Sequence, residues 1–451
     1  MKVKIESSKI VKPLHDDGMA PGGAAADEWV PLSVLDKVTY GEHVALIYAF
    51  RPPNPPNAAL ELGLARALAV YREWAGRIGV GPDGRRSVCL NDAGARFVEA
   101  TVDAPLAVWP FGAPSPEARR LHPRIDAVEE LVQVQLTRFS CGSLAVGFAG
   151  HHQIADGQAT GNFFAAWGLA TRGLPVYPVP VCDRGTRFAP RDPPLVEFPH
   201  RETEYKAAPA SADHHADNAD ENEDGFFAAA PGKVKVHRMH LSKEFVARLK
   251  ARASSGLPPP RRGYTTFQSV VAHLWRTITA ARGLGAGVTT KVRISVNGRT
   301  RMRPPVPRDY FGNVVLWAFP RSDAGQLVAR PVGHAAELIH RAVAAVDDAY
   351  FRSFVDFASS GVVEAEGLVP TADSDQTVLC PNLELDAWLG INFFDLDFGS
   401  GAPIYFMPTY YPMEGSLFLL PSVLGDGSME AYVSLFDNHL DEFKKICHKI
   451  A

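Results

Sequence analysis

Residues 131–139 read Leu-Val-Gln-Val-Gln-Leu-Thr-Arg-Phe, residues 143–148 read Ser-Leu-Ala-Val-Gly-Phe, and residues 151–157 read His-His-Gln-Ile-Ala-Asp-Gly. The strict alternation of the first segment predicts a half-buried strand. The second segment is more fully apolar and is predicted to pair with the first through the hairpin turn at residues 140–142. A helix is predicted to follow over residues 162–170. The two histidines are therefore expected on a strand-to-helix turn.

Strands and helices are predicted to alternate on both sides of this segment. Period-two and apolar runs predict strands at residues 2–6, 44–50, 96–102, 233–241 and 291–296, and three- to four-residue periodicity predicts helices at residues 60–71, after Ser242 and at residues 265–276. We therefore expect an α/β chain with two similar-sized domains, residues 1–185 and 233–451. Residues 186–232 form the predicted crossover between them. Within it, Ala207–Asp224 has no large apolar side chain before Phe226 and is predicted to be disordered.

Composition and charge narrow the possible functions. The chain has 451 residues, of which 46% are hydrophobic and 21% charged, with a net charge of −4 and no basic stripe. This argues against a nucleic-acid partner. The five cysteines are widely spaced without a C-x-x-C pair, which predicts reduced, mostly packing thiols. No apolar run reaches the ~18 residues of a membrane span, so we expect a cytoplasmic protein without a membrane partner.

Several common catalytic motifs are absent. The sequence contains no G-x-x-x-x-G-K-[ST] phosphate loop, no G-x-S-x-G elbow, no H-E-x-x-H and no G-x-G-x-x-G after a predicted strand. The sequence motifs that usually indicate nucleotide hydrolysis, serine hydrolysis or dinucleotide-dependent redox chemistry are therefore missing.

The histidine turn is the most suggestive segment for chemistry. A histidine held after a buried strand can project into a cleft and take a proton near pH 7. The alternative is a histidine pair satisfied in the core, with Asp156 as the N-cap of the next helix and Gly157 easing the turn.

Two other segments carry candidate residues. Asp397-Phe-Gly-Ser-Gly401 joins an apolar segment to a turn that contains a carboxylate, although Asp and Gly make turns in many proteins. Arg299, Arg301, Arg303 and Arg308 could bind phosphates or hold carboxylates.

These segments together resemble the BAHD acyltransferases, a plant family that transfers acyl groups from coenzyme A thioesters to hydroxyls and amines. The resemblance covers nearly the whole chain, and its motifs are H-x-x-x-D-G at His152, Asp156 and Gly157, D-F-G-x-G at Asp397, Gly399 and Gly401, Leu32-Ser-Val-Leu-Asp36, and Tyr310-Phe-Gly-Asn313. Within the family, the segments around residues 71–77, 92–101 and 151–167 most resemble the hydroxycinnamoyltransferases of grasses that act on amines such as agmatine and tryptamine.

The resemblance implies a fold and roles for single residues. Two mixed-sheet domains would enclose a channel at their interface, as in CoA-dependent acyltransferases. His152 would be the general base in mid-channel. Asp156 would be structural and paired with an arginine, for which Arg299 is the candidate. Asp397 would also be structural, supporting the CoA channel without touching substrate.

The chain departs from the family pattern at two places that bear on the substrate. Ser400 replaces the family tryptophan, so any role of an indole N–H there is lost. Members that use shikimate carry an arginine where this chain has Trp388-Leu-Gly390, so a cationic or neutral amine becomes the more plausible acceptor. The candidate acceptor-binding residues are Glu364, Glu366, Glu384, Asp386, Trp388 and Gly390, unless the four carboxylates are solvated at the surface. An aromatic amine would instead use an apolar slot, for which Phe393, Phe394, Tyr405 and Phe406 are candidates, unless these are ordinary packing residues.

We therefore expect a monomeric enzyme that transfers p-coumaroyl or feruloyl from its CoA thioester to a primary amine, with agmatine ahead of tryptamine. Acyl-CoA is expected as a co-substrate, with no bound cofactor and no metal. An O-acyltransferase acting on an alcohol and a non-catalytic acyl-CoA binding protein remain alternatives.

Overall fold

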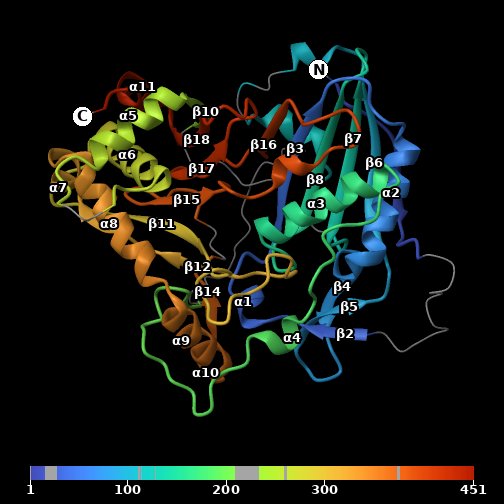
Figure 1. Ribbon diagram of the computed structural model, residues 1–451, viewed down its shortest axis with the longest axis horizontal. Coiled ribbons are helices and arrows are strands. Elements are labelled where there is room, and N and C mark those ends of the chain that lie inside the picture. Colours follow the sequence, from blue (N-terminus) through green and yellow to red (C-terminus); the bar gives the residue numbers. More distant parts are fainter. Residues whose placement is uncertain are drawn as a thin grey trace, which may run out of the picture.

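A computed structural model describes residues 2–15, 28–109, 112, 114–126, 128–208, 233–258, 262–372 and 376–450. The segment predicted to be disordered, Ala207–Asp224, lies outside the described residues from residue 209 onward. The chain forms two large mixed sheets, each covered by helices (Figure 1).

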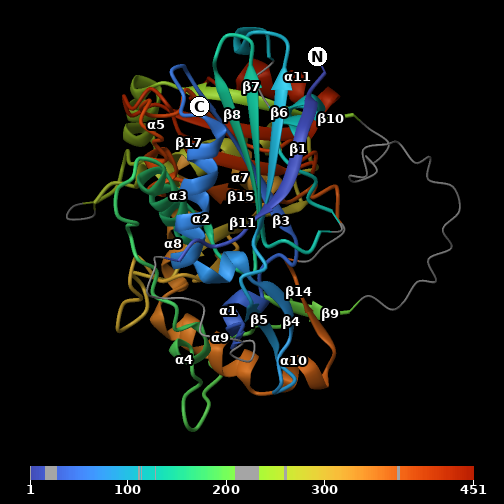
Figure 2. The ribbon, with the colours of Figure 1, turned by 90° about the vertical axis from the view of Figure 1, so that its right-hand side faces the viewer.

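The first sheet holds the predicted hairpin at its centre. Its six strands are, in spatial order, β1 (Lys4–Val11), β6 (Ala95–Val102), β7 (Val132–Phe139), β8 (Leu144–His151), β3 (His43–Phe50) and β16 (Tyr405–Pro408). Figure 2 shows β1, β6, β7 and β8 side by side. Only β6 and β7 are parallel neighbours. Helices α2 (Asn57–Val70) and α3 (Gly157–Thr171) pack against each other beside this sheet.

The second sheet belongs to the later part of the chain. Its strands are β10 (Val234–Leu241), β18 (Met429–Phe436), β17 (Ser416–Pro421), β15 (Leu383–Ala387), β11 (Thr289–Asn297) and β12 (Val315–Ala318), and β13 (Arg321–Asp323) also pairs with β11. Helix α6 (Thr266–Ala281) packs against α5 (Lys243–Ala253), α7 (Ala324–Ala329), α8 (Val332–Ala345) and α11 (Asp437–Ile446).

Shorter elements connect and flank the two sheets. They are α1 (Val34–Lys37), α4 (Arg184–Arg187), α9 (Asp348–Ser359), α10 (Val362–Ala365), the three-stranded sheet of β2 (Glu28–Pro31), β5 (Arg86–Leu90) and β4 (Arg77–Val80), and the pair of β9 (Tyr205–Ala207) and β14 (Leu368–Pro370). Short 3₁₀ helices are η1 (Arg72–Ala75), η2 (Leu106–Val108), η3 (Pro116–Leu121) and η4 (Phe393–Asp395).

Strand β16 crosses between the two halves. The sequence places residues 405–408 in the C-terminal domain, but they form the edge of the first sheet, antiparallel to β3. The division into residues 1–185, 186–232 and 233–451 therefore stays a prediction about the chain, and the sheets do not follow it at β16.

The polar residues of β7 are more buried than the alternating sequence pattern predicts. Gln133, Gln135 and Thr137 alternate with apolar residues, yet all three are buried. The reason is a covering segment, because Gln133 donates to the carbonyl of Arg124 and Gln135 to that of Arg120, each at 2.7 Å. The prediction of a half-buried strand is therefore wrong, whereas its bounds are right to within one residue.

The cysteines form no disulfide, as predicted. Only Cys89 and Cys447 are buried packing residues, however, and Cys141 and Cys182 are exposed. The expectation of mostly packing thiols therefore holds for only part of the set.

Candidate active site

Residues from both halves of the chain line a cavity of about 230 Å³ that contains the histidine of the turn. The first half contributes His152 and Tyr40, and the second contributes Glu384, Asp386 and Trp388. Three of the predicted acceptor-binding residues therefore lie in the same cavity as His152.

His152 is held at its backbone and at one ring nitrogen. It follows β8, and its N–H donates to the carbonyl of Glu42 at 2.9 Å. Its carbonyl accepts from Nδ2 of Asn313 at 3.0 Å, and its Nδ1 lies 3.1 Å from Oγ1 of Thr39. Burial lowers the pKa of His152, and the carboxylate of Asp156 opposes part of that effect. The imidazole is therefore neutral at pH 7, as a general base must be.

The neighbouring His151 fits the alternative of a histidine packed in the core, although its Nδ1 has no hydrogen-bond partner among the described residues. Its ring packs edge to face on His43, with centroids 5.2 Å apart. Burial, with the nearby His43, lowers its pKa to about 3. The two histidines of the turn thus have different surroundings, and only His152 lines the cavity.

Asp156 has both of its carboxylate oxygens occupied by protein donors. Oδ1 accepts from the N–H of Ala159, which makes Asp156 the N-cap of α3. Arg299 forms a bidentate pair with it at 2.6 and 3.0 Å. The N–H of Val314 donates to Oδ2 at 3.0 Å. The expected pair with Arg299 and the N-cap are both present, and Gly157 begins the helix.

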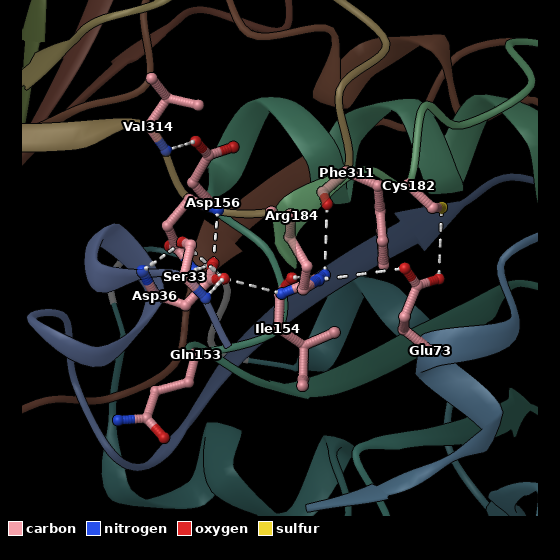
Figure 3. A network of polar contacts seen from close by, with 12 residues as sticks. Ser33, Asp36, Glu73, Gln153, Ile154, Asp156, Cys182, Arg184, Phe311 and Val314 are labelled. Carbon is pink, nitrogen blue, oxygen red and sulfur yellow. Dashed lines mark hydrogen bonds and ion pairs between the residues drawn. The ribbon is translucent and has the colours of Figure 1, made fainter. Parts of the chain in front are cut away.

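A second buried ion pair lies beside the first and was not foreseen (Figure 3). Asp36 accepts from the backbone and the hydroxyl of Ser33, and Arg184 donates to its Oδ2 at 3.0 Å. Its Oδ1 accepts from both N and Nδ2 of Asn313. The side chains of Asp36 and Arg184 are completely buried. The sequence marked Asp36 and Asn313 only as parts of family motifs, with no signal for this contact.

The strand β15 gives the cavity an acidic end. Glu384 and Asp386 lie two residues apart and so point to the same face of the strand. The hydroxyl of Tyr40 donates to Glu384, and Arg293 lies 3.8 Å from the same carboxylate. Burial, reinforced by Glu384, raises the pKa of Asp386 to about 7. A cation bound here would favour the charged form of both acids.

Apolar side chains complete the lining. Trp388, Leu389, Ile391 and Phe418 are among them. Trp388 packs edge to face on Phe418, with ring centroids 5.3 Å apart. Such a surface suits an aromatic ring or an alkyl chain.

Three of the candidate acceptor residues lie elsewhere. Glu364 and Glu366 are exposed on and beside α10, and Glu366 forms a surface ion pair with Arg201 at 2.5 Å. Figure 1 places α10 beside α9 at the lower edge of the molecule. Gly390 is exposed at a turn with φ of 77° and does not line the cavity. The carboxylates that reach the cavity are those on β15, so these three residues do not line it, and their role in acceptor binding stays a prediction.

The predicted aromatic slot is part of the core. Phe393 and Phe406 are buried, with ring centroids 5.0 Å apart, and Phe406 also packs on Tyr48. Neither these two nor Phe394 and Tyr405 line the cavity of His152. The alternative of ordinary packing residues is therefore the correct one.

The Asp397 turn is outside this cavity. Oδ1 of Asp397 accepts from the N–H groups of Gly399 and Gly401 at 2.8 and 2.9 Å, and Oδ2 lies 3.5 Å from Arg172, the C-cap of α3. Both glycines have positive φ, 105° and 89°, which explains the residue type. Ser400 contacts Asn54 at 3.4 Å. Asp397 thus folds the turn and ties it to α3.

Among the described residues no group of three or more His, Cys, Asp or Glu side chains could hold a metal ion. In the same part of the chain, no helix is long and apolar enough to cross a membrane.

The sequence is similar to known proteins along its whole length. A model of the transferase family matches residues 1–449. The chain is 54% identical over 453 residues to agmatine hydroxycinnamoyltransferase 1 of Oryza sativa subsp. japonica, with 99% of each chain covered. It is 51% identical over 453 residues to putrescine hydroxycinnamoyltransferase 3 of the same plant, with 100% of each covered. For tryptamine hydroxycinnamoyltransferase 2, again from that plant, the identity is 38% over 454 residues, with 99% of each covered.

Solved structures share the fold at lower identity. Vinorine synthase matches with a TM-score of 0.69 and 22% identity, covering 98% of this chain and 96% of that one. F. graminearum TRI101, complexed with coenzyme A and deoxynivalenol, matches with a TM-score of 0.73 and 18% identity, covering 93% and 97%. These likenesses confirm the predicted α/β fold with two mixed sheets.

Proposed function

The chain belongs to the transferase family and, within it, to the BAHD acyltransferases, and we propose that it transfers a hydroxycinnamoyl group from a CoA thioester to a primary amine. Acyltransferases of this family use CoA thioesters as co-substrates. Agmatine is the acceptor that we place first. The observation that carries this choice is the acidic end of the cavity, where Glu384 and Asp386 lie in the same cavity as His152.

His152 would act as the general base. An alkylamine has a pKa near ~10, so only about one part in a thousand is unprotonated at pH 7. That form attacks the thioester carbonyl, a C–N bond forms, and the nitrogen becomes acidic. His152 takes the proton as the tetrahedral intermediate forms, and the C–S bond then breaks with loss of the CoA thiolate, which regains a proton from the imidazolium. No covalent enzyme intermediate is required.

The acidic end would hold the second cation of the acceptor. Tyr40 contacts the ring of His152, with centroids 5.4 Å apart, and its hydroxyl reaches Glu384. The side chain of Tyr40 therefore lies between the imidazole of His152 and the carboxylate of Glu384. The four-carbon chain of agmatine has a similar reach, so its amine can face His152 while its guanidinium meets Glu384 and Asp386.

The first experiment measures thiol release from p-coumaroyl-CoA with agmatine, putrescine, tryptamine, tyramine and shikimate. We expect turnover with agmatine or putrescine and none with shikimate. Glu384→Gln should raise the KM for agmatine at least tenfold and leave that for tryptamine nearly unchanged. Glu366→Gln, which alters the surface pair with Arg201, is the matched control and should match wild type. Turnover with shikimate alone, or an equal loss in both variants, would contradict the proposal.

The remaining expectations are also proposals. We propose that the protein is a monomer in the cytoplasm, needs no metal, and binds neither nucleic acid nor membrane, as its charge balance and sequence suggest. Molecular mass in solution, cell fractionation and activity after dialysis against a chelator test these points. Asp397, Gly399 and Gly401 are proposed to support the fold without touching substrate.

A further inference from the structure

Thr39 contacts the ring of His152. It lies two residues after the end of α1, next to the C-cap Val38, and is buried, with a relative exposure of 4%. Its Oγ1 lies 3.1 Å from Nδ1 of His152. Because Nδ1 faces this hydroxyl, Nε2 is the ring nitrogen left for the substrate.

A hydroxyl beside Nδ1 can stabilise either of two forms of the neutral ring. If Nδ1 carries the proton and donates to Thr39, Nε2 has a free lone pair and can act as a base. If Thr39 donates to Nδ1, the ring proton is on Nε2, and the ring cannot accept a proton from the amine. The direction of this hydrogen bond therefore decides whether His152 can function as a base.

The surroundings of Nδ1 favour the first form. Asn313 donates through Nδ2 to Asp36 and to the carbonyl of His152, which fixes the orientation of its amide. Its Oδ1 is consequently a buried acceptor with no hydrogen-bond donor among the described residues. The Asn313 side chain, together with Asp156 and Asp36, also favours the protonated state of the ring. This region thus presents acceptors and negative charge, which suit an N–H on Nδ1.

We infer that Thr39 is a positioning residue that accepts the Nδ1–H of His152 and so keeps Nε2 unprotonated toward the substrate. The inference rests on the proposed role of His152 as the base. Thr39 also lines the cavity, but in this scheme it acts through the tautomer of the imidazole and not through a contact with substrate. Figure 3 shows Ser33 and Arg184 around Asp36, and Asp36 also accepts from Asn313, whose Nδ2 donates to the backbone carbonyl of His152.

Kinetics provide the first test. Thr39→Val keeps the shape but removes the hydroxyl, and we expect kcat to fall roughly 10- to 100-fold with KM for both substrates within about threefold of wild type. Thr39→Ser restores an acceptor and should return kcat to within about threefold. The matched control is Thr279→Val, because Thr279 is also buried and its hydroxyl has no hydrogen-bond partner among the described residues. A Thr39→Val enzyme with unchanged kcat, or a Thr39→Ser enzyme as slow as Thr39→Val, would overturn the inference.

A spectroscopic test does not depend on the reaction. In protein labelled with ¹⁵N-histidine, long-range ¹H–¹⁵N spectra report which ring nitrogen is protonated, and His152→Gln identifies the signal. We expect wild type near pH 8 to have the proton on Nδ1, and Thr39→Val to show a mixture or the Nε2–H form. An Nε2–H ring in wild type, or the same tautomer in both proteins, would refute the role of Thr39. If wild type shows the expected tautomer but transfers no acyl group, the proposed function fails and the assignment of Thr39 stands.

Discussion

At the scale of single residues, Asp386 links the acidic end of the cavity to pH. Burial and the neighbouring Glu384 raise its pKa to about 7, while Arg293 acts in the opposite direction. Below that pH the carboxyl is neutral and attracts a cationic acceptor less strongly. The value of kcat/KM for agmatine should therefore decline more steeply below about pH 7 than protonation of the attacking amine alone requires.

Asp386→Asn tests this dependence. The variant has no proton to gain, so the additional steepness below about pH 7 should disappear, and the KM for agmatine at pH 8 should rise about tenfold. Tryptamine has no second cation, so its pH profile should lack this additional steepness with both wild type and Asp386→Asn. The measurement is the pH profile of kcat/KM for the two amines. Persistence of the additional steepness in Asp386→Asn would assign it to another group.

His152 predicts a different feature of the pH profile. Burial lowers its pKa below the ordinary histidine value of 6.5, so the neutral base persists to lower pH. At saturating substrates kcat should therefore stay constant down to pH 6.5 and decline only below it. His152→Ala should lower kcat by about 10²- to 10⁴-fold and remove this limb. A decline of wild-type kcat that begins well above pH 7 would contradict the assignment.

At the scale of elements, the loop of residues 310–314 is held between two buried ion pairs. Arg299 donates to the carbonyls of Tyr310 and Gly312, and Arg184 donates to that of Phe311. The N–H groups of Asn313 and Val314 donate to Asp36 and Asp156. A loop from the second half is thus fixed by carboxylates from the first half.

Asp36→Asn should loosen this arrangement. The change leaves Arg184 buried beside Glu73, whose carboxylate is 3.9 Å away, and places an NH₂ group where donors already converge. Removing one partner of a buried pair typically costs ~3–5 kcal/mol, and we expect a loss of that size in the free energy of unfolding in urea. Glu366→Gln, on the surface, should unfold like wild type. A loss near zero for Asp36→Asn would show that the pair contributes little.

The crossover segment is attached to α9 by a different set of contacts. Ser353 on α9 accepts from the N–H groups of Glu197 and Phe198 at 2.9 and 3.1 Å and also lies 2.9 Å from Nε2 of His200. His200 in turn contacts Glu204 at 3.0 Å. The Ser-His-Glu order resembles that of a hydrolytic triad, but Ser353 is completely buried. It therefore anchors the chain.

Ser353→Ala should separate stability from activity. The substitution leaves two buried backbone donors without their acceptor, at a cost of roughly 1–3 kcal/mol each before any relaxation. We expect the midpoint of urea unfolding to fall while kcat and KM stay within twofold of wild type, since Ser353 does not line the cavity. The comparison is Ser360→Ala, because Ser360 is exposed and its hydroxyl donates to the carbonyl of Phe357 and accepts from the N–H of Val362 at 3.4 Å. A parallel loss of activity would indicate that the crossover also shapes the site.

Local sequence patterns predict the helices and strands better than they predict which of these elements pack together. The N-caps at Asp156 and Ser242 were predictable because each side chain bonds a backbone N–H three residues on. The shared face of Glu384 and Asp386 follows from strand geometry, but the position of β15 near His152 depends on parallel pairing with β11 and β17. The burial of Gln135 depends on a segment 15 residues away. Contacts set by tertiary packing leave no local pattern to read.

At the scale of the whole molecule, the two halves share a core. Phe393, Phe398 and Phe406 come from the second half but pack in the core of the first sheet. Strand β16 completes the edge of that sheet beside β3 (Figure 1). The core of the first sheet is therefore complete only when residues from the second half pack into it.

A chain cut between residues 220 and 221 tests this interdependence. The cut lies between β9, which pairs with β14 of the second half, and β10, which pairs with β18. Co-expressed residues 1–220 and 221–451 should copurify and keep activity within about tenfold of the intact chain, because the ion pairs of Asp36 and Asp156 and the β16–β3 pairing form without the covalent link. Residues 1–220 alone lack β16 and leave Asp156 without Arg299, so this fragment should aggregate or unfold without cooperativity. If it instead gives a sharp unfolding transition, the first sheet is an independent domain, and β16 is an addition that it does not need.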